Sequence, residues 1–279
     1  MHFSQHGRML HWQPIQPQDS FGCGRRHGLH HRRLEFALSL HGGGTNISNL
    51  NQDILGRLQV PLPQKSVQGK IASILSAYDD LIENSTRRIK ILEEMAKMIY
   101  REWFVNFRFL GHEKVKMVES EMGPIPNGWQ ASCIDRIASE VRNSISPTEL
   151  APDTPYVGLE HIPRKSIALS EWGGVGDVQS TKLRFNCGDI LFGKIRPYFH
   201  KVVVASVAGV CSSDAIVIVP KKAEFLPLVL CCVSSEDFVA QATQTSQGTK
   251  MPRANWDVLT RYPVPLPEAP ILCRFNVSV

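Results

Sequence analysis

A helical pattern of apolar residues begins at Lys65 and continues to about Phe107. The apolar residues recur at steps of mostly three and four, charged residues lie between them, and no proline interrupts the run. At 1.5 Å per residue, a helix of roughly 40 residues is about 60 Å long. Because the seam is close to a heptad, we expect this helix to pair with another one, in the same chain or in a second chain. The seam consists of Ile71, Leu75, Tyr78, Ile82, Ile89, Leu92, Ala96, Ile99 and Trp103.

A second pattern starts at Met122–Trp129 (MGPIPNGW), where two prolines and two glycines mark a boundary. From there to Pro267, short apolar runs alternate with turn residues, which predicts a compact mixed domain of about 145 residues. The fold class is therefore α+β: one mixed α/β domain plus a long coiled-coil-type helix. We expect one further helix over 225–241. The predicted strands are 155–159, 189–192, 201–205 and 215–219.

One stretch of the chain occurs twice. GTNISNLNQDILGRLQVPLP at Gly44–Pro63 recurs as GTKMPRANWDVLTRYPVPLP at Gly248–Pro267, and ten of the twenty positions are identical. The first copy leads directly into the long helix, and the second leads into EAPILCRFNVSV. We therefore interpret 44–64 as the end of a first domain and 268–279 as the start of a second long helix.

Residues 1–43 differ from the rest of the chain, because they hold seven of the ten histidines and show no sustained period. Four of these residues could be imagined as zinc ligands, but no second cysteine pair completes a standard spacing, so we expect no metal site. They are Cys23, His27, His30 and His31. The expected division of the chain is 1–43, an irregular segment that is disordered or aberrant; 44–64, a domain remnant; 65–109, the long helix; 110–122, a linker; 123–267, the complete domain; and 268–279, the second helix start.

Composition narrows the class of protein only slightly. Hydrophobic residues make up 43% of the chain and charged residues 20%, which is typical of a soluble globular protein. The net charge of +5 is compatible with a polyanionic partner and equally with an ordinary protein that has a slight excess of Lys and Arg. Seven cysteines without a C-x-x-C pair favour reduced thiols, and neither a signal peptide nor a membrane-spanning run is visible. We expect a cytoplasmic protein that does not associate with a membrane.

The segment Phe192–Lys201 (FGKIRPYFHK) is the first candidate for contact with DNA. It combines cations with aromatic residues next to turn-forming Gly193 and Pro197, which suits groups that reach a groove. The alternative is a solvated hairpin rim whose cations lie along apolar surface. The candidate contacts are Lys194, Arg196, Tyr198, His200 and Lys201.

The segment Gln247–Asn255 (QGTKMPRAN) is the second candidate. Its side chains suit hydrogen bonds to phosphates and base edges, and Pro252 could start a short helix whose N-terminus faces the DNA backbone. The alternative is a structural turn that closes the domain, since Asn255 coincides with Asn51 of the first copy. The candidate contacts are Thr249, Lys250, Arg253 and Asn255.

No catalytic set stands out in the sequence. The methyltransferase signature N/D-P-P-Y/F is absent, as are the phosphate loop G-x-x-x-x-G-K-S/T and a convincing nuclease pattern. Asp79 and Asp80 are successive residues of a helix, so they point apart and are better interpreted as part of a charged face than as an acid pair.

Several motifs resemble, in order and spacing, those of the specificity subunit of type I restriction–modification systems. The long-helix stretch KIASILSAYDDLIENSTRRIKILEEMAKMIYREWFVNF is similar to the central spacer of that family, and GPIPNGW is similar to the entry into a target recognition domain. GDILFGKIRPYFHKVVVA, CSSDAIVIVP and the closing GTKMPRANWDVLTRYPVPLPE also match the family pattern. The resemblance covers about residues 44–279.

The resemblance implies a non-catalytic subunit that binds double-stranded DNA. Family members carry two target recognition domains, each followed by a long helix, and the helices form an antiparallel coiled coil. Each domain reads one half of a split DNA sequence, while the helices set the spacing and hold two methyltransferase subunits. Here only the last twenty residues of the first domain and the first turns of the second helix are recognisable.

The same resemblance assigns the cofactors to other subunits. S-adenosylmethionine and ATP with Mg²⁺ are expected on partner subunits and none on this chain, and a restriction or translocase subunit would be contacted indirectly.

The unpaired seam leaves open a homodimer through the spacer helix. For the cluster of Trp103, Phe104, Phe107 and Phe109 we expect a core role in docking the helix, with the exposed charged faces along 79–97 left for a methyltransferase subunit.

The alternative to a specificity subunit is a coiled-coil interaction protein or remnant without sequence-specific DNA binding. A third interpretation is an enzyme with a site in 123–267.

Overall fold

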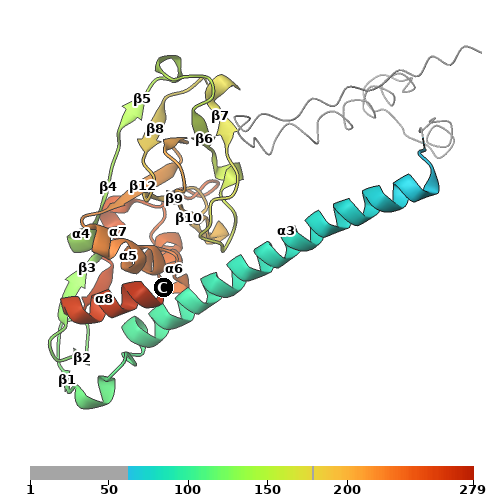
Figure 1. Ribbon diagram of the computed structural model, residues 1–279. Coiled ribbons are helices and arrows are strands. Elements are labelled where there is room, and N and C mark those ends of the chain that lie inside the picture. The colour runs from blue at the N-terminus through green and yellow to red at the C-terminus, as the bar shows by residue number, and fades with distance from the viewer. Residues whose placement is uncertain (1–61, 178) are drawn as a thin grey trace, which may run out of the picture. The chain divides into compact units, whose positions relative to one another are not determined.

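The structure is a computed structural model that describes residues 62–279 apart from residue 178. Its longest element is the helix α3 (Lys65–Tyr100), which continues as a π-helical turn over Arg101–Val105 (Figure 1). The predicted long helix is therefore confirmed and extends to Val105. It crosses from a unit that ends at Leu75 into one that spans Ser76–Val279, and the second unit is described below. In the described part of the chain, no helix is long and apolar enough to cross a membrane.

The second unit contains five short helices and thirteen strands among the described residues. The helices are α4 (Ile134–Ile137), α5 (Leu226–Val233), α6 (Glu236–Gln244), α7 (Trp256–Leu259) and α8 (Ala269–Ser278). The strands are β1 (Met117–Val118), β2 (Ile125–Pro126), β3 (Gln130–Cys133), β4 (Ala138–Glu140), β5 (Ser144–Ile145), β6 (Pro155–Val157), β7 (Gly173–Gly174), β8 (Lys182–Phe185), β9 (Ile190–Gly193), β10 (Val202–Val204), β11 (Gly209–Cys211), β12 (Ala215–Pro220) and β13 (Pro263–Leu266).

The strands form two main sheets and two small ones. One main sheet has the order β10-β9-β12-β4, the other has the order β5-β8-β11-β6-β7, and β1-β2 and β13-β3 pair separately. The neighbouring strands run antiparallel except for the parallel pair β11–β6. The four strands expected from the sequence appear as β6, β9, β10 and β12. The α+β class is confirmed.

The sheet β10-β9-β12-β4 is covered on both faces. In β9, Ile190 and Phe192 pack into the core that holds α5 and α6, while Leu191 packs into the core formed with the other main sheet. Val202 and Val203 of β10 alternate in the same way. Because side chains of a strand point alternately to its two faces, a sheet covered on both sides is apolar at every position, which explains the continuous apolar runs in the sequence.

The prediction of a single helix over 225–241 is wrong in its extent, because two helices, α5 and α6, occupy this region. The serines at the break explain it, since serine side chains compete for backbone groups. Ser234 Oγ donates a hydrogen bond to Leu230 O at 2.7 Å, and Ser235 Oγ accepts one from Phe238 N at 3.2 Å as the N-cap of α6. The chain therefore turns between α5 and α6, and the second helix ends at Gln244.

The aromatic residues at the end of α3 lie in the core, as expected. Phe104 and Phe109 are 3% exposed, and Phe107 packs against the same cluster. The rings of Phe104, Phe107 and Phe109 lie around Trp129, with centroid distances of 5.4, 5.7 and 5.2 Å. Trp129 belongs to the boundary sequence GPIPNGW, so this boundary supplies the residue on which the helix end packs.

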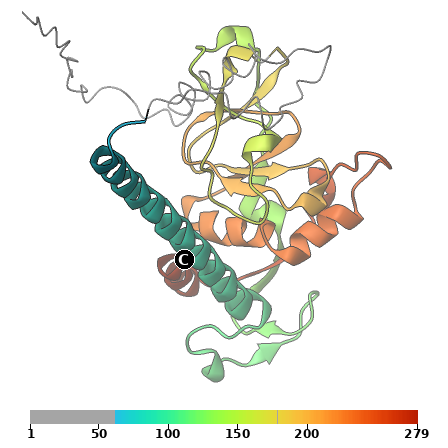
Figure 2. The same cartoon turned by 90° about the vertical axis from the view of Figure 1, so that its right-hand side faces the viewer.

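Helix α8 packs against the same helix end (Figures 1 and 2). Phe275 is 0% exposed, and its ring meets that of Phe104 edge to face at 4.8 Å. Nearby, β13 pairs with β3 along its whole length, so the second copy of the repeated segment ends by joining the entry strand of the domain. Of the first copy, 44–61 lies outside the described residues, as does the whole of 1–43 with the histidines considered as ligands.

Candidate functional site

The two basic segments singled out in the sequence are adjacent in the structure. Ile195 and Arg253 form an antiparallel bridge. Arg196 N donates to Pro252 O, and Ala254 N donates to Lys194 O, both at 2.8 Å. Residues about 60 positions apart in the chain thus form one surface, held by backbone hydrogen bonds that do not depend on side-chain identity.

Arg253 lies at the centre of this surface. Its backbone exchanges two hydrogen bonds with Gln247, at 2.9 and 3.1 Å, which closes the tip of the segment. Its guanidinium is half exposed and lies 3.7 Å from the carboxylate of Asp214. An ion pair of this exposure contributes little to stability, so the side chain can exchange Asp214 for another anion at small cost.

A pocket of about 250 Å³ opens beside Arg253. Its walls include Lys194 together with Glu140 and Arg142, which form an ion pair at 2.8 Å. The carboxylate of Glu140 is largely buried while the guanidinium of Arg142 is exposed. Cations and a hydrogen-bond acceptor therefore face one small opening, a combination that suits phosphates and the amino groups of base edges. Neither Glu140 nor Arg142 was a candidate in the sequence, because both lie outside the two basic segments.

The other half of the surface is a tight turn. Pro197–Phe199 form a single 3₁₀ turn, flanked by Arg196 and His200, which both have left-handed backbone angles with φ of 50° and 54°. The guanidinium of Arg164 stacks on the ring of Phe199 at 4.1 Å. This contact was missed in the sequence, where the cation-rich HIPRKS stretch around Arg164 was the available signal.

The predicted contact residues differ in their exposure. Tyr198 is 51% exposed. The candidates at the surface are Tyr198, Thr249, Lys250 and Arg253; those that are half-buried are Lys194, Arg196, Lys201 and Asn255; and His200 is buried.

Two of these residues direct their side chains to backbone carbonyls inside the protein. His200 is 4% exposed, and its Nε2–H donates to Ser234 O at 2.8 Å. The Lys201 ammonium donates to Leu159 O, and burial, together with the charge of Arg164, lowers the pKa of Lys201. We therefore leave His200 and Lys201 out of the contact set proposed below.

Asn255 has a structural role in this arrangement. Its side-chain oxygen accepts from Asp257 N at 3.0 Å and caps α7. The expectation that Pro252 starts a helix is wrong, since α7 begins at Trp256 and is one turn long. The cause is the pairing of the Pro252 carbonyl with Arg196, which holds this stretch extended.

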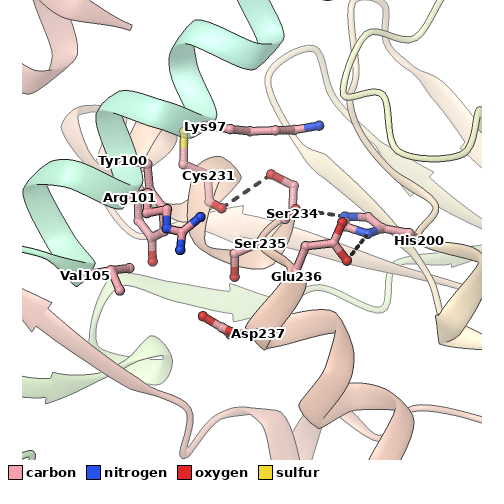
Figure 3. A pocket seen from close by; sticks show the side chains of 10 residues that line it. All are labelled: Lys97, Tyr100, Arg101, Val105, His200, Cys231, Ser234, Ser235, Glu236 and Asp237. Carbon is pink, nitrogen blue, oxygen red and sulfur yellow. Dashed lines mark hydrogen bonds and ion pairs between the residues drawn. The ribbon is translucent and has the colours of Figure 1, made fainter.

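A larger cavity of about 410 Å³ lies on another part of the unit, where the end of α3 meets the α5–α6 junction (Figure 3). It is lined by Lys97 and Arg101 from the helix end and by Glu236 and Asp237 from the start of α6. His200 reaches this cavity from the turn, and its Nδ1 lies 3.6 Å from a carboxylate oxygen of Glu236. Among the described residues, no group of three or more metal-ligating side chains is present.

Comparison with known proteins agrees with the resemblance noted in the sequence. The family model described as "Type I restriction modification DNA specificity domain" matches residues 28–94. The chain is 27% identical over 252 residues to the type I restriction enzyme EcoDI specificity subunit of Escherichia coli, covering 82% of this chain and 56% of that protein. It is 29% identical over 124 residues to the MjaIX specificity subunit of Methanocaldococcus jannaschii, covering 43% of this chain and 29% of that one.

Solved structures of the same kind of subunit are also similar. The S subunit of a type I restriction–modification system from M. genitalium matches with a TM-score of 0.48 at 17% identity, over 84% of this chain and 61% of that one. The HsdS subunit from Thermoanaerobacter tengcongensis matches with a TM-score of 0.40 at 14% identity, over 88% and 58%. The chain spans a little over half the length of the Escherichia coli relative. Over the ranges given, the chain is similar to specificity subunits of type I restriction–modification systems.

Proposed function

We propose that this chain is a non-catalytic DNA-specificity subunit of a type I restriction–modification complex. In this proposal the domain 123–267 binds one half of a bipartite DNA target, and the long helix docks methyltransferase subunits. Methylation with S-adenosylmethionine and ATP-dependent cleavage take place on the partner subunits. The protein acts in the cytoplasm, where such a complex meets DNA.

The observation that carries the proposal is the meeting of two basic segments on one surface. Lys194 and Arg196 from one segment lie directly beside Arg253 from the other, with Thr249 and Lys250 exposed at the tip. Cations that neutralise phosphates supply affinity, and side chains that reach base edges supply sequence preference. Exposed Tyr198 and the stacked pair of Arg164 and Phe199 add planar groups at the edge of this surface.

A second function is favoured by a different observation, the apolar residues along α3. Between Tyr78 and Met98, eight large apolar side chains of the helix are 44–63% exposed. They are Tyr78, Leu81, Ile82, Ile89, Ile91, Leu92, Met95 and Met98. Apolar side chains exposed in this number mark a surface that pairs with other helices, so the chain could act as a coiled-coil interaction protein without reading DNA.

One experiment separates the two functions. The 279-residue chain is used to capture a type I methyltransferase subunit, and the complex is then incubated with a pool of randomised duplexes. The specificity subunit predicts that a short motif is enriched and that competition with unrelated DNA does not remove it. Binding that falls steeply with salt and enriches no motif contradicts the proposal and leaves the interaction protein.

A further inference from the structure

Glu93 of α3 holds a loop of the recognition domain. Its Oε1 atom accepts three hydrogen bonds, from Ser166 Oγ at 2.7 Å, Ile167 N at 2.9 Å and Ala168 N at 3.1 Å. Three donors on one carboxylate oxygen form a strong, directional clamp, because hydrogen bonds to an ionised group are stronger than neutral ones. In the sequence, Glu93 was only one of many charged residues on the helix.

Lys97 adds a second attachment one helical turn later. Its Nζ donates to Lys165 O at 2.9 Å. Residues four positions apart lie on the same face of a helix, so Glu93 and Lys97 together fix the segment 165–168 on α3. At these two positions the helix is therefore occupied by the domain.

The segment 165–168 in turn holds the strand and turn that carry the candidate DNA contacts. Lys165 N donates to His200 O at 2.8 Å, and Val204 N donates to Ile167 O at 3.0 Å. Lys165 has a φ of 60°, which is left-handed like that of His200. Left-handed angles at residues other than glycine persist only where surrounding contacts impose them, and here each of the two residues is held by the other's backbone.

The turn is also fixed from its inner side by α6. Lys165 Nζ donates to Glu236 Oε1 at 3.0 Å. The other oxygen of Glu236 lies 3.6 Å from His200 Nδ1, as Figure 3 shows. His200 Nε2 donates to Ser234 O. His200 is therefore an internal support of the turn, and the exposed residues of the turn are those that precede it.

Direct contacts thus connect α3 with the basic surface. They lead from Glu93 to the segment 165–168, from there to His200, and through the turn to Arg196, whose backbone joins Pro252 and the neighbouring Arg253. The steps are hydrogen bonds or short stretches of the chain itself, so a displacement at one end has to be absorbed at the next contact.

We propose that Glu93 is a positioning residue for DNA recognition: it fixes the turn 196–200 relative to α3 and thereby makes sequence discrimination depend on the helix that docks partner subunits. This inference rests on the proposed function. Glu93 does not touch DNA in it. The carboxylate acts through the segment 165–168, which it holds in the conformation that presents Arg196.

The test compares three variants of the full chain in complex with a methyltransferase subunit. Glu93→Ala removes the acceptor, Glu93→Gln keeps an oxygen at the same place, and Glu94→Ala makes the same charge change at a neighbouring exposed position. The measured quantity is the ratio of affinities for a duplex with the selected motif and for a scrambled duplex. We expect Glu93→Ala to lower this ratio about 5-fold or more, at the low end of couplings between sites. Glu94→Ala should keep the wild-type ratio, and Glu93→Gln, which retains a weaker neutral acceptor, should lower it by a smaller factor than Glu93→Ala.

Two outcomes overturn the inference. One is an equal ratio for Glu93→Ala and Glu94→Ala; the other is a loss for Glu93→Gln as large as that for Glu93→Ala, which would assign the effect to charge. If Glu93→Ala does not fold, Ser166→Ala removes one donor from the other side and should lower the ratio by a smaller factor. A Ser166→Ala variant with the wild-type ratio then overturns it.

A second measurement separates this inference from the proposed function. If the wild-type complex selects no motif, the proposed function fails. Amide hydrogen exchange of the chain then tests the positioning alone: exchange over 166–168 and 196–200 should be faster in Glu93→Ala than in Glu94→Ala. Equal exchange in both variants overturns the positioning role, whatever the DNA experiment shows.

Discussion

Replacement of Phe275 by alanine tests whether α8 is an integral part of the domain core. Phe275 is 0% exposed and contacts the rings of Phe104 at 4.8 Å and Trp103 at 5.9 Å. The substitution removes the largest side chain by which α8 packs on the helix end. Val277 of the same helix is 85% exposed, so Val277→Ala is a matched control that shortens a side chain without opening the core.

The expected loss follows from the burial and the two ring contacts. A buried Phe→Ala change costs about 3–5 kcal/mol through lost transfer free energy and the cavity left behind. Each aromatic pair adds about 0.5–1.5 kcal/mol beyond its buried area, which favours the upper half of that range. In a unit of about 200 residues, 1 kcal/mol shifts the melting temperature by roughly 2–4 °C, so a fall of about 10 °C or more is expected. Val277→Ala should stay within about 0.5 kcal/mol of wild type.

The assay is urea denaturation followed by circular dichroism, with thermal unfolding as a second probe. The free energies of unfolding of the two variants are compared under identical conditions. If Phe275→Ala is as stable as Val277→Ala, then α8 does not pack on α3 in solution. A lower m-value in Phe275→Ala would show that α8 has detached and that less surface is buried in its native state.

Three further predictions concern charge and burial. Arg253→Ala should weaken DNA binding and reduce the slope of log affinity against log salt concentration by about one, whereas Arg261→Ala should leave both unchanged. Gel-shift titrations at several salt concentrations measure these slopes, and equal slopes for the two variants would contradict the prediction. Burial raises the pKa of the Cys232 thiol to about 12, so at neutral pH a thiol reagent should label exposed Cys273 much faster than Cys232. Peptide mass spectrometry measures the two labelling rates, and similar rates would contradict the burial of Cys232. A hydrogen bond from a lysine ammonium lowers the pKa of Glu236, so its stabilising effect is present at neutral pH and is lost as the pH falls through that lowered pKa. The stability difference between wild type and Glu236→Gln should shrink in acid, and a pH-independent difference would count against the ion pair.

Much of the fold follows from the apolar pattern. The long helix was predictable because its seam persists over many turns, and the strands β9 and β12 because their apolar runs are bounded by turn residues. The break at Ser234–Ser235 was missed, since the apolar content is helical on both sides and the sequence does not show that two serines cap and end helices there. Short strands such as β3 and β13 depend on pairing between distant segments, which no local pattern reveals.

The candidate site was predictable in its composition and unpredictable in its geometry. The two basic segments were visible, but the bridge between Ile195 and Arg253 joins residues that are far apart in the sequence. The burial of His200 depends on its left-handed backbone angle and on a carbonyl of another element. Glu93 carried no signal at all, because a charged residue on a long helix is usually solvated, and only the tertiary structure shows the three donors that it meets.

The central claim is that the surface formed by these two segments reads DNA sequence. Selection from a randomised duplex pool, carried out in parallel with the wild-type complex and with the double variant Arg196→Ala/Arg253→Ala, tests it most directly. Wild type should enrich one short motif, and the double variant, though folded and still bound to the methyltransferase subunit, should enrich none. The same motif from both proteins, or no motif from wild type, would contradict it.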